Sequence, residues 1–236
     1  MGSRRTRGFT IIEVMLFLSI SGVLFIGLMI GVSTNINQQR YRDSVTSLAG
    51  LLQQQYSEVS NTRNDRDKGW RCEASETIQN VENGQARGTT DCVILGRYIR
   101  TIEGAAKIET GDVIGAEPTT ATVSGSDIAA LSLYAPKVSS FGQSAYLPEW
   151  DALLRDEDGR PSDFTILVLR SPESGLIRVF AASGSIPSQL TDMLTAEAAR
   201  RKVAICVEPN GWNIGGTQAV IFIDFSRLAH HFINPT

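Results

Sequence analysis

The sequence predicts an α+β chain in which one long N-terminal helix packs on an antiparallel β-sheet. Three observations predict it: an apolar stretch at residues 9–32, a helical apolar periodicity that continues to about residue 60, and a series of short apolar runs separated by turn residues after that. A soluble domain usually takes about 100 to 200 residues. The 236 residues therefore fit one apolar helix and one globular head with a single core.

The apolar stretch at residues 9–32 has 24 residues and one charge, Glu13. As a helix it is about 36 Å long and crosses a hydrocarbon core of about 30 Å. A removable secretory signal has a shorter apolar region and an Ala-x-Ala-like cleavage site, so we expect this helix to remain attached. Arg4, Arg5 and Arg7 precede it, and basic flanks stay cytoplasmic. The pattern predicts a single-pass membrane protein with an extracytoplasmic head.

Glu13 is a carboxylate within this apolar stretch, and its burial without compensation costs several kcal/mol, roughly 3 on insertion scales. The carboxylate can snorkel to the interface, take up a proton or pair with a cation. Something in its surroundings should therefore compensate for its charge.

A family resemblance is carried by residues 7–14, which read Arg-Gly-Phe-Thr-Ile-Ile-Glu-Val. This segment resembles the cleavage motif of type IV prepilins and of type II secretion pseudopilins. In that family a membrane aspartyl peptidase cuts after the glycine and methylates the new N-terminal residue. The resemblance implies a leader at residues 1–8, cleavage between Gly8 and Phe9, and N-methylation of Phe9. It also implies a pilin-like fold.

The resemblance further implies that Glu13 is an assembly residue. The methylated amine of one subunit keeps its positive charge and can pair with the Glu13 carboxylate of a neighbour. An unpaired buried charge costs free energy, so a subunit that enters the filament in the wrong register would be destabilised by the loss of this pair. The implied partners are sister pilin or pseudopilin subunits, prepilin peptidase and the inner-membrane assembly machinery. The implied destination is a cell-surface or periplasmic filament, and the large head favours a minor pilin or pseudopilin.

Small residues occur along the apolar stretch and permit either close approach of neighbouring helices or local unwinding. The span contains no proline, although many pilins have one there, so any unwinding would have to rely on Gly27 and Gly31. The small residues are Ser19, Ser21, Gly22, Gly27 and Gly31.

Residues 33–60 continue the helix as an amphipathic segment. Apolar residues recur at spacings of three and four, at Tyr41, Val45, Leu48, Leu52, Tyr56 and Val59. The opposite face is polar and carries Gln38, Gln39, Arg42, Asp43, Gln53 and Gln54. A polar break at residues 61–69 then begins the head, residues 61–236.

The head is predicted to be mainly antiparallel strands. Apolar or alternating runs bounded by turn residues occupy residues 92–102, 129–134, 164–169, 176–181, 203–207 and 219–225. Asn210-Gly211 and Gly215-Gly216 between the last two runs predict a long-looped hairpin. Residues 190–202, after Pro187, are predicted to form a surface helix.

The three cysteines are Cys72, Cys92 and Cys206. In an exported head, Cys72 and Cys92 can close a polar loop containing Asn83-Gly84 and Gly88, worth about 3 kcal/mol in the chain-entropy model. Cys206 lies in an apolar run and is predicted to be an inert core thiol. There is no Cys-x-x-Cys pair and there are only two histidines, so no metal site is predicted.

The sequence assigns no catalytic residue, cofactor or small-molecule substrate. It contains no nucleophile elbow, phosphate loop, dinucleotide fingerprint or zinc helix. His230 and His231 are adjacent in sequence and are interpreted as a solvated end of the chain. The acidic run at residues 156–158, before Gly159, lacks the alternating ligands of a calcium loop and is interpreted as a turn.

Two other functions stay open. The first is a single-span exported binding protein or enzyme that does not polymerise. The second is a minor pilin that binds DNA, for which Arg200, Arg201 and Lys202 form the densest basic run of the head. The formal charge of −3 makes DNA unlikely, because loss of the three leader arginines would leave 19 basic residues against 25 acidic ones.

Overall fold

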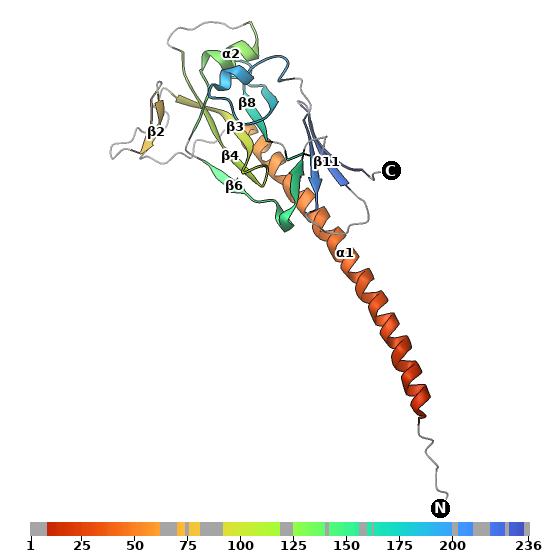
Figure 1. Cartoon of the computed structure of the whole chain (residues 1–236). Coiled ribbons are helices and arrows are strands. Elements are labelled where there is room, and N and C mark those ends of the chain that lie inside the picture. Colours follow the sequence, from red (N-terminus) through yellow and green to blue (C-terminus); the bar gives the residue numbers. More distant parts are fainter. Residues whose placement is uncertain are drawn as a thin grey trace, which may run out of the picture.

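The computed structural model describes residues 9–61, 70–73, 76–80, 92–118, 125–139, 142–155, 160–161, 163–199, 203–209, 218–224 and 227–233. One long helix, α1 (Ile11–Ser60), carries a head of antiparallel β-sheets and extends far beyond it towards the N-terminus (Figure 1). The predicted α+β, pilin-like arrangement of a long N-terminal helix and an antiparallel head is confirmed.

Helix α1 begins after Thr10 and ends at Ser60, as its periodicity predicted. Its C-terminal half is the half that the head buries, through Tyr41, Val45, Leu48, Leu52 and Val59 among others. The part of the chain that the structure describes holds one helix long and apolar enough to cross a membrane, and this is α1.

The expectation that Tyr56 lies on the buried face of α1 is wrong. Tyr56 is 39% exposed, whereas Gln55 is only 2% exposed. Positions 52, 55 and 59 follow the spacing of three and four that keeps residues on one helical face. Gln55 can be polar there because its Oε1 accepts a hydrogen bond from Arg97.

The main sheet has six antiparallel strands in the order β5-β4-β3-β8-β9, with β6 also paired to β4. The strands are β3 (Cys92–Ile102), β4 (Lys107–Ala116), β5 (Lys137–Val138), β6 (Ser144–Tyr146), β8 (Phe164–Arg170) and β9 (Ile177–Ser183). On one face Ile99, Ile108 and Ile166 pack with the buried residues of α1. On the other face Tyr98, Leu167 and Phe180 pack beneath α2 (Asp127–Leu133) and η2 (Leu190–Met193).

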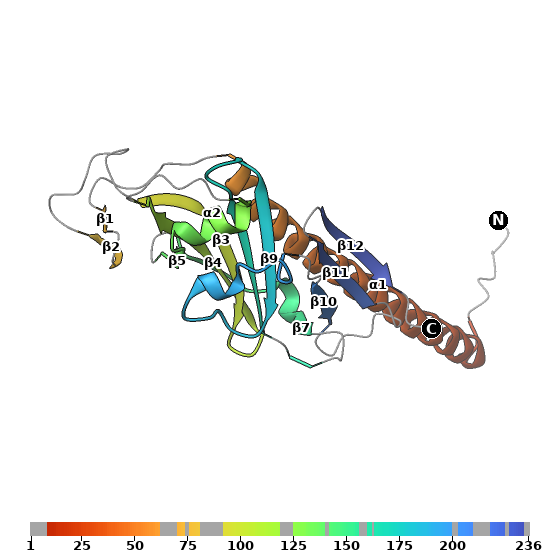
Figure 2. The same cartoon turned by 90° about the horizontal axis from the view of Figure 1, so that it is seen from above.

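This layered packing explains the composition of β8, which is apolar on both sides because both faces of the sheet are covered. Figure 2 shows α1 on one side of the sheet, with α2 and the 3₁₀ turn η2 on the side away from it.

A second antiparallel sheet has the strand order β12-β11-β10-β7 and also lies on α1. Its strands are β7 (Leu153–Arg155), β10 (Val203–Glu208), β11 (Gln218–Asp224) and β12 (Arg227–Ile233). The predicted hairpin between the last two apolar runs is present as the β10–β11 pair. A separate pair of strands, β1 (Trp70–Glu73) and β2 (Glu76–Asn80), lies at one side of the head, apart from the two sheets (Figure 1).

Tyr41 attaches this second sheet to the helix. Its buried hydroxyl donates to the carbonyl oxygen of Val207 at 2.5 Å and accepts from the amide nitrogen of Ala219 at 2.6 Å. Burial, as the main cause, raises the pKa of Tyr41 to about 12. One side chain of α1 therefore bonds two strands at once.

The predicted strand at residues 129–134 is wrong, because this segment belongs to helix α2 (Asp127–Leu133). Ser126 caps the helix by accepting a hydrogen bond from the amide of Ala129 at 3.3 Å. A short apolar run fits either a buried strand or a buried helix turn by periodicity alone, and here the cap and the sheet beneath decide for helix.

The predicted helix at residues 190–202 is also wrong over most of its length. The structure has only η2 and then a turn, and residues 200–202 lie outside the described part. The amide of Ala181 in β9 donates to the carbonyl of Ala198 at 3.2 Å. The carbonyl oxygen of Ala198 is therefore bonded to the edge strand β9, and not to the amide of a later residue in a helix.

Strand β4 had no counterpart among the predicted strands. Its sequence contains glycines and charged residues, which are poor strand signals. Gly111 is needed there because a Cβ atom would lie 2.7 Å from the ring of Tyr98. The close packing of Tyr98 of β3 against β4 thus requires a glycine at position 111, and this glycine weakens the strand pattern in the sequence.

Candidate functional site

The N-terminal half of α1 is the most unusual surface of the molecule. Its large apolar side chains are exposed, from 46% at Val14 to 78% at Ile11, and Phe9, just before the helix, is 85% exposed. Figure 1 shows this half of the helix projecting from the head. An apolar surface of this size needs a bilayer or neighbouring helices to cover it.

The start of the helix is organised by a capping box formed by Thr10 and Glu13. The Glu13 amide donates to Thr10 Oγ1 at 3.3 Å. In return, Glu13 Oε2 accepts from the Thr10 amide at 3.0 Å and from its hydroxyl at 3.1 Å. The one carboxylate of the apolar span therefore closes the first helical turn of its own chain.

The structure places two of the predicted N-terminal site residues close together in the chain. Phe9 precedes the N-cap Thr10, and Glu13 folds back over that first turn. Gly8 and the rest of the leader lie outside the described residues. The role of Thr10 was missed, although the spacing Thr-x-x-Glu is itself a capping signal.

The glycines of the span leave the helix open to neighbours. Around Gly22, Gly27 and Gly31, nothing lies within 4 Å of the position that a Cβ atom would take. The helix continues through all three, and Asn35 Nδ2 donates to the carbonyl of Gly31 at 3.0 Å. The described chain thus offers close approach at these glycines, whereas the unwinding considered from the sequence is not seen in this state.

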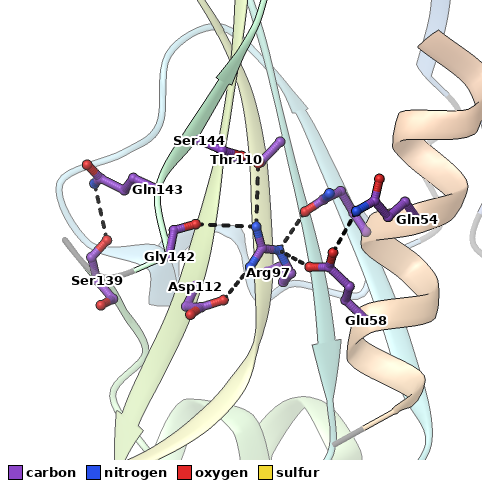
Figure 3. A network of polar contacts seen from close by, with 10 residues as sticks. Gln54, Glu58, Arg97, Thr110, Asp112, Ser139, Gly142, Gln143 and Ser144 are labelled. Atoms are coloured by element: carbon purple, nitrogen blue, oxygen red, sulfur yellow. Dashed lines mark hydrogen bonds and ion pairs between the residues drawn. The ribbon is translucent and has the colours of Figure 1, made fainter. Parts of the chain in front are cut away.

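A polar cluster centred on Arg97 attaches the other half of α1 to the head (Figure 3). On the helix side, Arg97 Nε donates to Gln55 Oε1 at 2.5 Å and lies 3.2 Å from Glu58 Oε2. On the sheet side, Arg97 Nη1 pairs with Asp112 Oδ1 at 2.6 Å. A single guanidinium therefore joins α1, β3 and β4.

The cluster is completed by neutral groups. Arg97 Nη2 lies 3.5 Å from Thr110 Oγ1 and 3.4 Å from the carbonyl of Gly142. Gly142 has φ +68° and a Cβ atom there would lie 2.5 Å from Asp112, so no other residue fits without movement. The side chains of Arg97 and Asp112 are only 13% and 12% exposed, which indicates a structural role. Sequence reasoning missed this cluster because its members are far apart in the chain.

The cysteines behave differently from one another. Cys92 is disulfide-bonded, whereas Cys206 carries a thiol. The side chain of Cys72 lies outside the described residues, so the Cys72–Cys92 pairing stays a prediction. Cys206 alternates in β10 with the buried Ile205 and Val207 and is half-buried on the opposite face of the strand.

The remaining candidate residues form no site in the described part of the chain. His230 and His231 lie in β12, paired with Ile221 and Val220 of β11, but their side chains are outside the described residues. The residues of the predicted acidic turn (156–159), the basic run (200–202) and the glycine-containing segments 210–216 and 83–88 lie outside the described residues too. Among the described residues, no group of three or more His, Cys, Asp or Glu side chains is placed to hold a metal ion.

Comparison with known protein families identifies the N-terminal segment. The prokaryotic N-terminal methylation motif matches residues 3–29. This motif is the prepilin signal of type IV pilins and pseudopilins, so the resemblance carried by residues 7–14 is confirmed. Searches of curated proteins and of solved structures find no match to this chain.

Proposed function

We propose that this chain is a structural subunit of a type IV pilus or of a type II secretion pseudopilus, processed by prepilin peptidase and assembled through its N-terminal helix. One observation carries the proposal: the methylation motif at residues 3–29 coincides with the half of α1 whose apolar residues are exposed. The large head favours a minor pilin or a pseudopilin over a major subunit. The motif points to a structural subunit, a class that is generally not enzymatic.

In this proposal the chain has four parts: a leader at 1–8, a membrane helix at 9–32, its amphipathic continuation at 33–60 and the head at 61–236. Before assembly the protein is a single-pass membrane protein with a cytoplasmic N-terminus and an extracytoplasmic head. Prepilin peptidase cuts between Gly8 and Phe9 and methylates Phe9, and the inner-membrane assembly machinery moves the subunit into the filament.

The geometry of Glu13 supports a role in assembly. In the single chain its Oε2 accepts both Thr10 hydrogen bonds, and the carboxylate has further lone pairs on Oε1. The methylated amine of a neighbouring subunit can bind at Oε1 while the capping box stays intact. The capping box therefore holds the carboxylate in a fixed position. A neighbouring subunit can pair with it only in the correct register, and a shifted subunit would leave the charge unpaired.

Mass spectrometry of the N-terminal peptide tests the proposal directly. Membrane and sheared-surface or periplasmic filament fractions are compared from cells that make the protein. We expect a peptide that begins with N-methyl-Phe9 in the filament fraction. A variant with Gly8→Val is the control and should keep its leader. An intact leader on the unaltered protein in every fraction would contradict the proposal and favour a single-span exported protein that does not polymerise.

A further inference from the structure

The apolar surface of α1 continues beyond the predicted membrane span along one face of the helix. Residues 33–40 contain a single large apolar side chain, Ile36, and it is 43% exposed. Ile36 extends a row of residues whose spacings alternate between three and four, so the row follows one helical face. This row, named here the apolar stripe, consists of Met15, Leu18, Gly22, Phe25, Met29, Val32 and Ile36.

The apolar stripe leads to a loop of the head, residues 146–151, named here the basal loop. The loop contains the 3₁₀ turn η1 (Glu149–Asp151) and lies against α1. Ser47 of α1 donates to Glu149 Oε1 at 2.9 Å and accepts from the Tyr146 hydroxyl at 3.1 Å. Since Ser47 follows Ile36 by about three helical turns, it lies on the same face. The basal loop therefore covers the face of α1 that carries the stripe, just above the end of the stripe.

The basal loop presents two apolar side chains that the head leaves uncovered, because Leu147 is 68% exposed and Trp150 is 46% exposed. Arg40, one turn above Ile36, has its guanidinium carbon 4.7 Å from the centre of the Trp150 ring, a cation–π contact. Trp150 and Asp151 have φ values of 59° and 54°, in the left-handed region that bulky residues rarely adopt. Such conformations cost free energy and are often found at functional surfaces.

The basal loop lies too far along α1 for a bilayer to cover it. At 1.5 Å per residue, Arg40 is about 12 Å and Ser47 about 22 Å beyond Val32, the last residue of the predicted span. The polar layer of one leaflet is only about 5 to 7 Å thick. Exposed apolar side chains at this height therefore need a protein surface to cover them.

A second copy of this chain offers a matching surface. The methylation motif implies assembly with other pilin subunits, and in a filament outside the membrane only neighbouring subunits can cover the exposed stripe. Alternating spacings of three and four are the pattern along which helices pack side by side, about 8 to 10 Å apart. Copies inserted with the same topology are parallel, so a neighbouring α1 that follows the stripe past Ile36 meets the basal loop.

We propose that the apolar stripe and the basal loop form one contact surface for α1 of a second copy of this chain in the filament. The neighbouring helix packs along the stripe, and its residues 33–40 contact Leu147 and Trp150. These residues of the neighbour are accessible because the buried part of α1 begins at Tyr41. This contact rests on the proposed function and specifies which part of the head takes part in assembly.

Site-specific photo-crosslinking in cells that make the full chain tests this contact. The photoreactive residue p-benzoylphenylalanine replaces Leu147, and a tagged copy of the unaltered chain is made in the same cells. The matched control carries the photoreactive residue in place of Leu176, which is also exposed but lies between β8 and β9.

After irradiation of the filament fraction, we expect position 147 to give at least about fivefold more covalent dimer with the tagged copy than position 176. Mass spectrometry of the crosslinked peptides should place the link within residues 33–40 of the tagged copy. Equal dimer yields from the two positions would overturn the proposal. A product with a different protein or with a phospholipid would also overturn it, because the occupant would not be a second copy of this chain.

A matched pair of charge substitutions tests the stripe. Asn35 is next to Ile36 in sequence but lies about 100° away around the helix, off the stripe. We expect Ile36→Asp to lower filament yield at least about fivefold and Asn35→Asp to lower it less than about twofold. Neither side chain is buried, so thermal denaturation of the head should be unchanged in both variants. Equal filament yields from the two variants would contradict the stripe.

The N-terminus of the chain separates a failure of this contact from a failure of the proposed function. If the filament fraction contains chains that begin with N-methyl-Phe9 and position 147 gives no dimer, the contact is wrong and the proposed function stands. If the leader stays attached in every fraction and no filament forms, both are wrong.

Discussion

At the scale of single residues, Tyr41 shows how one hydroxyl joins parts of the fold that are far apart in sequence. It donates to Val207 and accepts from Ala219, and both bonds are buried. A phenylalanine would fill the same space but would leave the carbonyl and the amide without these bonds. Each buried group left unpaired costs roughly 1 to 3 kcal/mol.

We therefore expect Tyr41→Phe to lower the free energy of unfolding by about 2 to 4 kcal/mol. Urea denaturation of the detergent-solubilised protein, followed by circular dichroism, measures this loss. Tyr56→Phe is the matched control, because Tyr56 is 39% exposed and should lose less than about 0.5 kcal/mol. Equal losses in the two variants would contradict the role of the Tyr41 hydroxyl.

The pH dependence of stability gives a second readout of Tyr41. Burial raises its pKa to about 12 in the folded protein, against about 10 in an unfolded chain. The folded state thus holds this proton more tightly, so its contribution is complete below about pH 10 and is lost as the pH rises towards 12. Tyr41→Phe should reduce this alkaline loss of stability. Burial also raises the pKa values of Tyr98 and Tyr146, so part of the loss should remain.

Glu13 is the residue on which the assembly proposal can be tested most sharply. We expect Glu13→Ala to reduce filament yield at least tenfold while leader cleavage and membrane insertion continue, because the subunit loses its charge partner and not its apolar span. Thr10→Val is the control: it removes the Thr10 hydroxyl but keeps the carboxylate, and should cost about 1 kcal/mol of helix stability. Electron microscopy counts the filaments, and immunoblots of sheared fractions measure the amount of subunit released. Normal filaments with Glu13→Ala would contradict the assembly role.

At the scale of elements, α1 is one continuous helix with two different surroundings. Its first half carries exposed apolar residues, and its second half is attached to both sheets by apolar packing, by Tyr41 and by the Arg97 cluster. Through Arg97, the cluster links α1 to β3 and β4, so it helps to set the position of the helix on the main sheet.

Removing Arg97 should destabilise this junction strongly. We expect Arg97→Ala to cost about 3 to 5 kcal/mol, because it leaves the Asp112 carboxylate buried without its cation. Arg100→Ala is the matched control on the same strand. Arg100 pairs with Glu109 in a more exposed position and should cost about 1 kcal/mol or less. Urea denaturation distinguishes the two.

An apolar replacement of the pair separates the charge from the packing. The double variant Arg97→Met with Asp112→Leu should recover part of the stability lost in Arg97→Ala, because the Asp112 charge is then removed together with its cation, whereas Glu58 still loses its contact with Arg97. A double variant that is as unstable as Arg97→Ala would show that the cluster contributes more than charge compensation.

At the scale of the whole molecule, the head is built to fold without the exposed apolar half of α1. The buried residues of α1 lie at Tyr41 and beyond, whereas the apolar residues of the span are exposed. We expect a chain that begins at residue 33 to be soluble, monomeric and folded. A chain that begins at residue 47 lacks Tyr41 and Val45 and should be far less stable. Size-exclusion chromatography and thermal denaturation compare the two, and equal melting temperatures would contradict the arrangement.

The sequence alone determined the features that depend on local pattern. The periodicity of α1 predicted its end at Ser60, and the apolar runs predicted β3, β8, β9, β10 and β11 closely. The methylation motif was recognisable because it is a short continuous segment of sequence. These features need no information about distant residues, since helical spacing, strand alternation and a cleavage motif are all properties of neighbours in the chain.

Only the tertiary structure decided the features that depend on contacts between distant segments. It made residues 129–134 a helix over the sheet, joined Ala198 to the edge of β9, selected glycines in β4 and placed Gln55 in the core in place of Tyr56. Arg97 meets Gln55 and Asp112, which are 42 and 15 residues away. The free energy of such a residue depends on burial and on a partner from another strand or helix, and neither is encoded by the residues next to it.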